Sequence, residues 1–599
     1  MPIPAARSRK RPILSHAMGA GLALMLLSSA GAWAGPVEDL QVVLSDYDHL
    51  LNQNDPIGAA QRGDLAAAKR WPDDSPAAVK ERVQAITRLR DRLAALPAAG
   101  LSGQDALNHA LLLRKLTLDL EGARFDEERM PFNSDSGFFY VASYTAGSTR
   151  LRNEVEVQAY LARIAALPDY YATNIANMRR GLKTGFVQPK LVAEAAVRMT
   201  RTLADMKADE NALLEPLKSL PATIPAAQRQ AFLANGQKLV TDKVKPAEIA
   251  LADFFAKEYL PKARASLGAS SLPEGKAYYA YRVKRETTTE MSPDQVFDLG
   301  RSEIARIRAA MDGIIKETGF TVDFKAFLAF LRTSPEFYAT SREQLLEKSS
   351  RLAKRIDDRL PEYFSLLPRL PYGVRPVPAE IEEGYTSGRY HPGSPEQGVA
   401  GGLMINTSHL TMRPLYELPA LVAHEGVPGH HLQIALAQEL QGVPQFRRQE
   451  DITAYIEGWA LYTEQLVAEM GLYTTPYERF GMLSMEMWRA CRLVMDVGIH
   501  WKGMGREEAA SCLRDNSALA EKNIQSETDR YIGWPAQALG YKIGQLKISE
   551  LRARAERALG PKFDIKQFHA LMLNDGPMPM TMLEQRINGW IAAGGGKVP

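Results

Sequence analysis

Apolar residues recur at three- and four-residue spacing along most of this 599-residue chain, with charged residues between them. This spacing places apolar side chains on one face of a helix and charged side chains on the other. Proline- and glycine-rich breaks separate the periodic segments, which are clearest at residues 78–96, 155–166, 189–205, 292–318 and 341–359. The pattern predicts a mainly α fold, and the sequence shows no repeat at a solenoid period.

The helical pattern stops between about residues 370 and 409, where prolines and glycines are frequent. Short β-compatible pieces remain at 378–385 and 402–407, and helical patterns resume near residue 414. We therefore expect a large helical body around a cleft, with a small β-sheet insertion. This change in sequence pattern suggests an N-terminal helical region at 35–370 and a catalytic region at 371–599, although the two could form one continuous domain.

The N-terminus has the pattern of a secretory signal peptide. Basic residues at 7–11 precede an apolar run at 17–27, and Ala32-Trp33-Ala34 offers a cleavage site. A retained membrane anchor is the alternative, but the run is short for a spanning helix. No cysteine lies near the cleavage site, which argues against a lipoprotein anchor. We predict a periplasmic or secreted protein without stable membrane insertion after cleavage of residues 1–34.

Charge excludes the usual electrostatic argument for nucleic-acid binding. The whole chain has 73 Lys and Arg against 70 Asp and Glu, but four of the basic residues belong to the signal peptide. The mature chain is therefore close to neutral and lacks the excess positive charge that binds phosphates. The sequence leaves the oligomeric state open.

Cys491 and Cys512 are the two cysteines of the chain. Both lie in helical patterns, where buried free thiols are common, and one bridge is also possible in an oxidising compartment. The sequence does not decide between these states. A thiolate zinc site is excluded by the small number of sulfurs.

Three of the ten histidines gather in the octapeptide His424-Glu425-Gly426-Val427-Pro428-Gly429-His430-His431. The preceding residues are apolar and compatible with a helix, so His424 and Glu425 are expected to be buried. Buried imidazole and carboxylate groups are costly unless a charge or a hydrogen bond satisfies them. Zinc binds both groups, and a glutamate beside the first ligand can deprotonate a water molecule. Histidines that cap a helix or sit in a core are the alternative.

The octapeptide differs from HExxH, in which a four-residue step places two histidines on one helix face. Position 428 is a proline, and histidine returns only six and seven residues after His424. On a straight helix those residues lie about 9 and 10.5 Å along the axis, too far for one zinc ion. The segment between them must bulge or break. His431 has the better helical phase and His430 follows a glycine, so either could be the second ligand.

A third ligand is expected from the following helical segment. Glu457 lies in an otherwise apolar run, which is a costly place for a carboxylate without a cation. Glu464 follows seven residues later on the same face. It could hold the second nitrogen of a ligating histidine, or it could be a solvated surface residue.

These segments carry a resemblance to a known family. HEGVPGHH, followed by IEGWALYTE and RYIGWPAQALGYKIG, resembles the bacterial family described as domain of unknown function 885. The resemblance extends from residue 384 to residue 586 at least.

A more distant similarity implies a peptidase. Carboxypeptidase Taq, thimet-type oligopeptidases and angiotensin-converting enzyme are helical gluzincins with HExGH-type helices, and dipeptidyl peptidase III tolerates an expanded motif. Their third ligand is a glutamate some two dozen residues later; Glu457 here is 27 residues after His430. The similarity favours His430 over His431, although the first three lack the two-residue expansion.

The same similarity gives roles to residues of the C-terminal third. Tyr541, or else Tyr531, would hydrogen-bond the tetrahedral oxyanion. His500 would line the site, and Arg530 and Arg489 could bind a substrate carboxylate. Core tyrosines and solvated or paired arginines are the alternatives. The segment GLMINTS, just before the metal helix, would be an edge strand that binds an extended peptide.

Together these features predict zinc-dependent hydrolysis of short peptides by water that Glu425 activates. The alternatives are a zinc amidohydrolase that acts on a non-peptide amide or an acyl-amino acid, and an inactive peptide-binding protein of the same fold. The sequence does not give the substrate or distinguish exo- from endopeptidase.

Overall fold

The computed structural model describes residues 35–598, apart from 322, 379–381, 383–384 and 396–397. The predicted signal peptide at 1–34 lies outside the described residues. Among the described helices, none has both the length and the apolar character needed to cross a membrane.

The predicted mainly α fold is confirmed. The N-terminal helices are α1 (Pro36–Asn54), α2 (Pro56–Gln61), α3 (Pro76–Ala95), α4 (Gly103–Ala123), α5 (Val141–Ser148), α6 (Glu154–Ala165), α7 (Leu167–Thr184), α8 (Lys190–Asp205), α9 (Glu215–Lys218), α10 (Ala226–Leu239), α11 (Lys245–Phe254), α12 (Gly275–Thr287), α13 (Pro293–Glu317), α14 (Phe324–Thr333) and α15 (Arg342–Tyr363).

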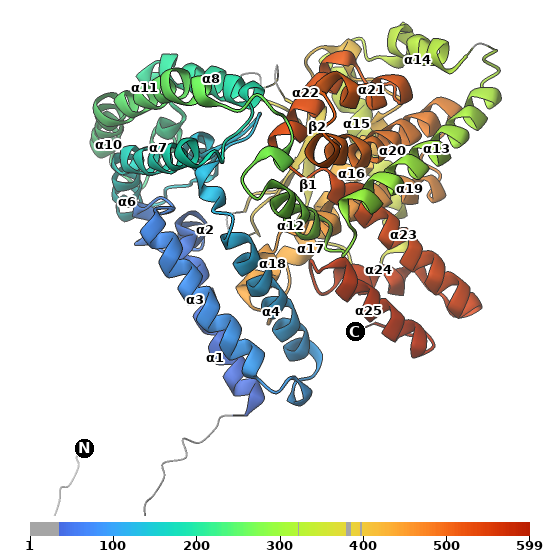
Figure 1. Cartoon of the computed structure of the whole chain (residues 1–599), viewed down its shortest axis with the longest axis horizontal. Coiled ribbons are helices and arrows are strands. Elements are labelled where there is room, and N and C mark those ends of the chain that lie inside the picture. Colours follow the sequence, from blue (N-terminus) through green and yellow to red (C-terminus); the bar gives the residue numbers. More distant parts are fainter. Residues whose placement is uncertain (1–34, 322, 379–381, 383–384, 396–397, 599) are drawn as a thin grey trace, which may run out of the picture.

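After a small sheet, the chain continues as α16 (Leu418–Glu425), α17 (His430–Gln438), α18 (Gln445–Gln449), α19 (Thr453–Glu469), α20 (Pro476–Val497), α21 (Arg506–Asn516), α22 (Glu521–Gly533), α23 (Leu539–Leu559), α24 (Ile565–Leu573) and α25 (Met580–Ala592). Figure 1 shows α6, α7, α8, α10 and α11 gathered on one side of the molecule and α13 and α19 to α23 on the other.

Local sequence explains where the long helices begin. Ser292 and Gln295 form a reciprocal capping box at the start of α13, and Thr475 and Glu478 form another at the start of α20. A proline follows each cap at the first helical position, where its fixed φ suits the helix. These two helices pack along each other and approach closely at Gly300, where a Cβ atom would lie 2.7 Å from that of Leu493.

The sheet has three strands in the order β1-β3-β2: β1 (Tyr372–Pro376), β3 (Gly401–Ile405) and β2 (Gly388–His391). β3 pairs in parallel with β1 and antiparallel with β2. The predicted strand at 402–407 overlaps β3, but the expectation of an edge strand there is wrong, because β3 is central. The piece at 378–385 falls partly outside the described residues, and its described members 378, 382 and 385 lie in no strand.

The buried cores draw on both halves of the sequence. One cluster joins Leu40 and Leu112 of the N-terminal helices to Trp459 and Leu583 of the C-terminal ones. A second joins Phe139 to Phe480 in the same way. The predicted boundary at residue 370 is not a boundary between these cores, and the division into two regions stays a prediction.

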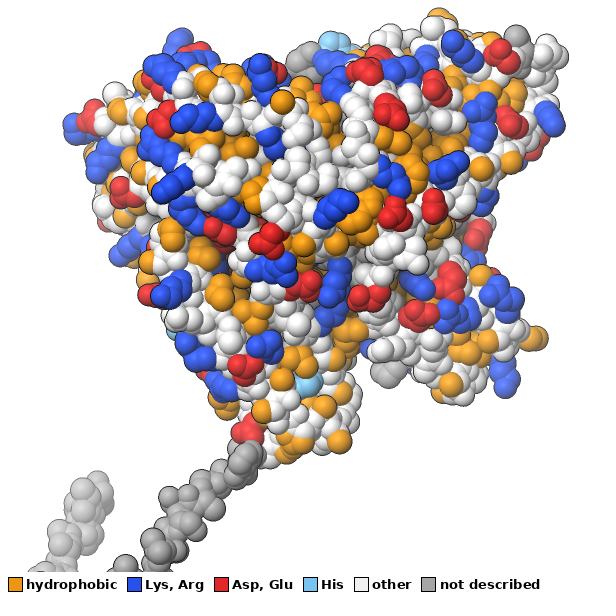
Figure 2. Space-filling model, viewed as in Figure 1, with side chains coloured by type: hydrophobic (Ala, Val, Ile, Leu, Met, Phe, Trp, Pro, Cys, Tyr) orange, Lys and Arg blue, Asp and Glu red, His pale blue; other side chains and the backbone are white. Residues whose placement is uncertain are grey.

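Two further features concern covalent and surface chemistry. Cys491 of α20 and Cys512 of α21 form a disulfide, which decides the question that the sequence left open. Lys and Arg side chains are mixed with Asp and Glu over the face drawn in Figure 2, as the near-neutral composition leads one to expect.

Candidate metal centre

The helix that carries His424 breaks directly after Glu425, as the proline at position 428 predicts. α16 ends at Glu425, and α17 begins at His430. The turn between them requires glycine, because a Cβ atom on Gly429 would lie 2.1 Å from the carbonyl oxygen of His424. The chain therefore folds back tightly and places His430 opposite His424.

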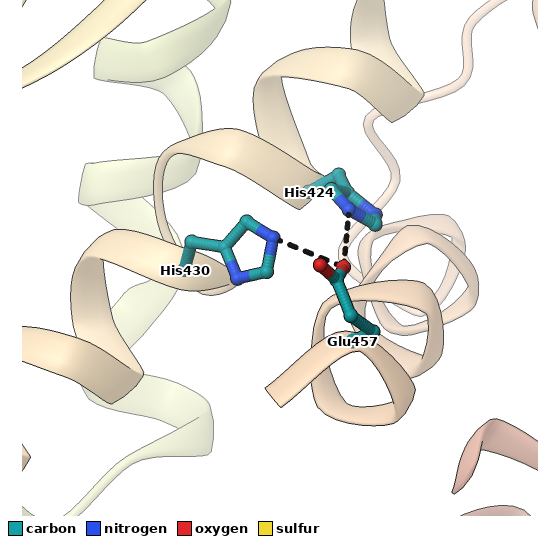
Figure 3. A group of neighbouring side chains, drawn as sticks. All are labelled: His424, His430 and Glu457. Carbon is teal, nitrogen blue, oxygen red and sulfur yellow. Dashed lines mark ion pairs between the residues drawn. The ribbon is translucent and has the colours of Figure 1, made fainter. Parts of the chain in front are cut away.

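Two histidines and one glutamate converge in this fold (Figure 3). The Oε2 atom of Glu457 lies 3.5 Å from Nε2 of His424 and 3.3 Å from Nε2 of His430. Three ligand atoms, one from each residue, lie within 4.8 Å of one another. In a tetrahedral zinc site with bonds of about 2.0–2.2 Å, neighbouring ligand atoms are about 3.3–3.5 Å apart. The spacing of the three side chains fits such an ion.

Unsatisfied polar atoms support this fit. Oε2 of Glu457 and Nδ1 of His430 are buried and have no hydrogen-bond partner among the described residues. The short contacts between Glu457 and the two histidines thus lack hydrogen-bond geometry. Burial alone would raise the pKa of Glu457, but His430 and His424 hold it well below its usual range. The carboxylate is therefore charged, and a metal ion would give Oε2 the partner that it lacks among the described residues.

Glu464 holds the outer nitrogen of His424. Its Oε1 atom lies 2.8 Å from Nδ1 of His424 and 3.3 Å from a guanidinium nitrogen of Arg489. Glu464 is 1% exposed, so it is not a solvated surface residue. Burial would lower the pKa of His424, but Glu457 and Glu464 raise it to about 9. Glu464 fixes the ring so that Nε2 points toward Glu457.

His431 lies outside the cluster, although it adjoins His430. Its Nδ1 atom is 2.9 Å from the hydroxyl of Tyr390, and its ring packs on that of Tyr372 at 4.5 Å between centroids. Burial lowers the pKa of His431 to about 4. The geometry therefore selects His430 from the two histidines that the sequence left open.

Glu425 lines a pocket near this cluster. Its Oε2 atom accepts a 2.7 Å hydrogen bond from the backbone N–H of Tyr390 in β2. The pocket beside it is also lined by Glu417, whose pKa burial raises to about 7. Glu425 thus adjoins His424 in the chain, is fixed at one oxygen by the sheet, and faces a cavity.

Tyr531 and His500 occupy a different place from the one expected of site-lining groups. The Tyr531 hydroxyl accepts hydrogen bonds from Trp488 and Arg492 and donates one to Glu527. Both ring nitrogens of His500 bond to backbone atoms, the N–H of Ala269 and the carbonyl of Tyr531. Their polar atoms are used up in the core, so neither has a group left for a substrate.

The two predicted carboxylate-binding arginines are also engaged. Arg489 pairs with Glu464 and donates to the carbonyl of Met485. Arg530 donates to Gln537 at 2.7 Å and reaches the Tyr541 hydroxyl at 3.3 Å. The contacts of Arg489 give it a positioning role behind His424.

Tyr541 remains the candidate for the oxyanion. It belongs to α23, which crosses α19 where Gly458 and Gly544 meet; a Cβ atom on Gly458 would lie 2.5 Å from the Cα atom of Gly544. Glu457 and Tyr541 both lie within one helical turn of this crossing. The guanidinium of Arg492 stacks over the Tyr541 ring at 4.1 Å.

Several residues near the cluster have no recognisable signal in the sequence. Tyr390 acts partly through its backbone N–H, which any residue but proline has. The hydroxyl of Tyr385 lies 2.9 Å from Nε2 of His391, the last residue of β2. Arg413 lines the pocket of Glu425, and what distinguishes it from most other arginines is the absence of an ion pair with any described carboxylate.

Solved structures share this architecture. A "putative lipoprotein" from Colwellia psychrerythraea superimposes with a TM-score of 0.86 at 26% identity, over 93% of this chain and 99% of the other. A "putative lipoprotein of unknown function" from Shewanella oneidensis gives a TM-score of 0.68 at 18% identity, over 92% and 99%, and shows the fold alone.

The comparison with curated proteins found no match. A family model matches residues 56–587, which extends the predicted resemblance to the N-terminal half. The chain belongs to the family described as "Bacterial protein of unknown function (DUF885)".

Proposed function

We propose that this protein is an exported, zinc-dependent metallopeptidase that hydrolyses short peptides in the periplasm or outside the cell. The observation that carries the proposal is the convergence of Nε2 of His424, Nε2 of His430 and Oε2 of Glu457, with 3.5 and 3.3 Å between the carboxylate and the two rings. Glu425, the residue after the first histidine, supplies a carboxylate at the edge of a pocket.

His424, His430 and Glu457 hold the ion in this proposal, and Glu464 orients His424. Zinc, when bound, supplies a positive charge that polarises a carbonyl and lowers the pKa of water. Glu425 takes a proton from water through its free oxygen and passes it to the leaving nitrogen. Tyr541 donates a hydrogen bond to the oxyanion that forms at the scissile carbonyl.

The test combines metal analysis with activity. We expect protein purified without chelators to contain about one zinc ion per chain and to hydrolyse members of a short-peptide library. Glu425→Gln is nearly isosteric and retains an oxygen that can accept the Tyr390 N–H. It should keep the zinc and lose about 10²- to 10⁴-fold in kcat, because only the proton-accepting group changes.

Glu469→Gln is the matched control, because this residue ends the same helix that carries Glu457 and its side chain is 47% exposed. It should behave as the wild type. Full turnover by Glu425→Gln would refute the proposed mechanism. Bound zinc with cleavage of acyl-amino acids but no peptides would point to the amidohydrolase instead, and peptide binding without zinc or turnover to the binding protein.

A further inference from the structure

The pocket beside Glu425 combines apolar walls with two arginines, Arg413 and Arg489. Its empty volume is about 590 Å³, which includes solvent at the open side of the pocket. Its walls include the side chains of Ile405, Leu418, Leu421, Met485, Trp488 and Leu519. A cavity of this kind accepts an apolar side chain, and a small number of polar groups fix the orientation of the ligand.

Arg413 is the polar group that stands out. It is half-buried, and its Nη1 atom donates a 3.3 Å hydrogen bond to the Ser387 hydroxyl, while its Nε atom is buried without a hydrogen-bond partner. No carboxylate of the described residues forms an ion pair with it. Burial lowers the pKa of Arg413, and none of the described acids offsets that effect. A guanidinium in this setting is stabilised when an anion arrives.

Neighbouring arginines form ion pairs or donate to backbone carbonyls of the described residues, unlike Arg413. Arg489, which lines the same pocket, pairs with Glu464. Arg342 pairs with Glu382 at 2.6 Å. Arg332, on the adjoining pocket, donates to backbone carbonyls of Arg514, Ser517 and Ala518. Arg413 thus has donors to spare in the pocket that also contains Glu425.

We infer that Arg413 binds a carboxylate of the substrate and that an apolar side chain next to this carboxylate fills the pocket. The inference rests on the proposed function, which it extends by naming the substrate class: peptides with an apolar residue beside a carboxylate. That carboxylate is either the C-terminus or the side chain of Asp or Glu. Both present two oxygens to the planar guanidinium fork.

The experiment compares matched peptides on the zinc-loaded, full-length mature protein. The first peptide ends in leucine with a free C-terminal carboxylate. The second is the same peptide with a C-terminal amide. The third also has a C-terminal amide but contains an added aspartate residue. We expect wild type to prefer the first or the third over the second by about 10- to 100-fold in kcat/KM, as charged hydrogen bonds of this kind contribute. The preferred peptide identifies the source of the carboxylate.

Arg413→Gln should bring this ratio close to one, and Arg413→Lys should give an intermediate ratio, because lysine retains the charge without the fork. Arg152→Gln is the control; its side chain is 73% exposed and lies beside α6, and the variant should keep the wild-type ratio. Zinc content and melting temperature verify that each variant is folded.

A binding measurement separates this inference from the peptidase proposal. Calorimetry with N-acetyl-leucine and with its amide requires no turnover. Preferential binding of the acid by wild type, lost in Arg413→Gln, supports the inference even if no peptide is cleaved. Equal binding or equal cleavage of the acid and the amide, unchanged in Arg413→Gln, would overturn the inference about Arg413. That result would not contradict the proposed metal centre.

Discussion

At the scale of the residue, the metal-binding cluster depends on how firmly Glu457 and the rings of His424 and His430 are held in place. Glu457 is held within an apolar helix, so its position is fixed by packing. His424 is held at Nδ1 by Glu464, whereas Nδ1 of His430 has no partner among the described residues. The two rings are therefore constrained to different degrees, and His430 is the one that can adjust to an ion.

Replacing each of the two adjacent histidines in turn tests which of them binds metal. His430→Asn should lose zinc at micromolar concentration, because it removes one of three protein ligands. His431→Asn should retain zinc, since that side chain contacts Tyr390 and Tyr372 instead. Competition with a colorimetric chelator measures both affinities. Retention of zinc by His430→Asn and its loss from His431→Asn would reverse the assignment.

The sequence revealed the cluster and left one choice within it. Polar residues in apolar runs pointed to His424 and Glu457, because burial of such groups requires a partner. The choice between His430 and His431 depended on the shape of the turn at Gly429, which spacing does not provide. Arg413 was missed because an arginine without an ion pair to a described carboxylate has the same sequence signature as one with such a pair.

At the scale of the element, the crossing of α19 and α23 connects stability to the site. Gly458 and Gly544 let the two backbones touch, and Glu457 directly precedes the first of these glycines. Any side chain at the crossing would push the helices apart and shift Glu457 relative to the histidines.

Gly544→Ala should therefore cost at least about 1–3 kcal/mol of unfolding free energy, the usual range for overpacking. A Cβ atom at that position would lie 1.9 Å from the carbonyl oxygen of Ala454. Zinc affinity should fall as well. Urea unfolding and chelator competition give the two readouts.

Gly589→Ala in α25 is the control, since no atom lies within 4 Å of its Cβ position. It should gain up to about 1 kcal/mol from helix propensity. A Gly544→Ala variant as stable as wild type would mean that the crossing is not tight.

Helices were predicted well because their signal is local. The expected helix at 292–318 is α13 (Pro293–Glu317), whose cap and periodicity lie in adjacent residues. The sheet was predicted less well, because the neighbours of a strand are set by distant pairing: β3 is central only because β1 and β2 join it from both sides.

At the scale of the whole molecule, buried histidines join segments from distant parts of the chain. Nδ1 of His569 in α24 donates to the carbonyl of Tyr363 at the end of α15, and its Nε2 accepts from the hydroxyl of Tyr462 in α19. The ring is therefore neutral. Burial lowers the pKa of His569 to about 3.

This neutral histidine predicts a pH effect on stability. Below about pH 6.5 the unfolded chain binds a proton at His569 that the folded chain does not, so this residue destabilises the fold increasingly as pH falls toward 3. Its contribution between pH 7 and pH 5 is about 2 kcal/mol. Buried Asp496, with a pKa raised to about 7, acts in the opposite direction.

The measurement is therefore a difference between variants. Between pH 7 and pH 5, the unfolding free energy of wild type, measured in urea, should fall by about 2 kcal/mol more than that of His569→Gln. His49→Gln, at an exposed position of α1, should follow the wild type. Parallel pH dependence of His569→Gln and wild type would show that His569 does not remain neutral.

The hydrogen bond between Glu425 and Tyr390 also affects whether two copies of this protein can associate through their sheet edges. β2 is an edge strand, and the free backbone groups of such edges attract strands from other chains. The outward N–H of Tyr390 is occupied by Glu425. A foreign strand could pair there only by displacing that carboxylate, so we expect Glu425 to disfavour edge-to-edge pairing of the sheet.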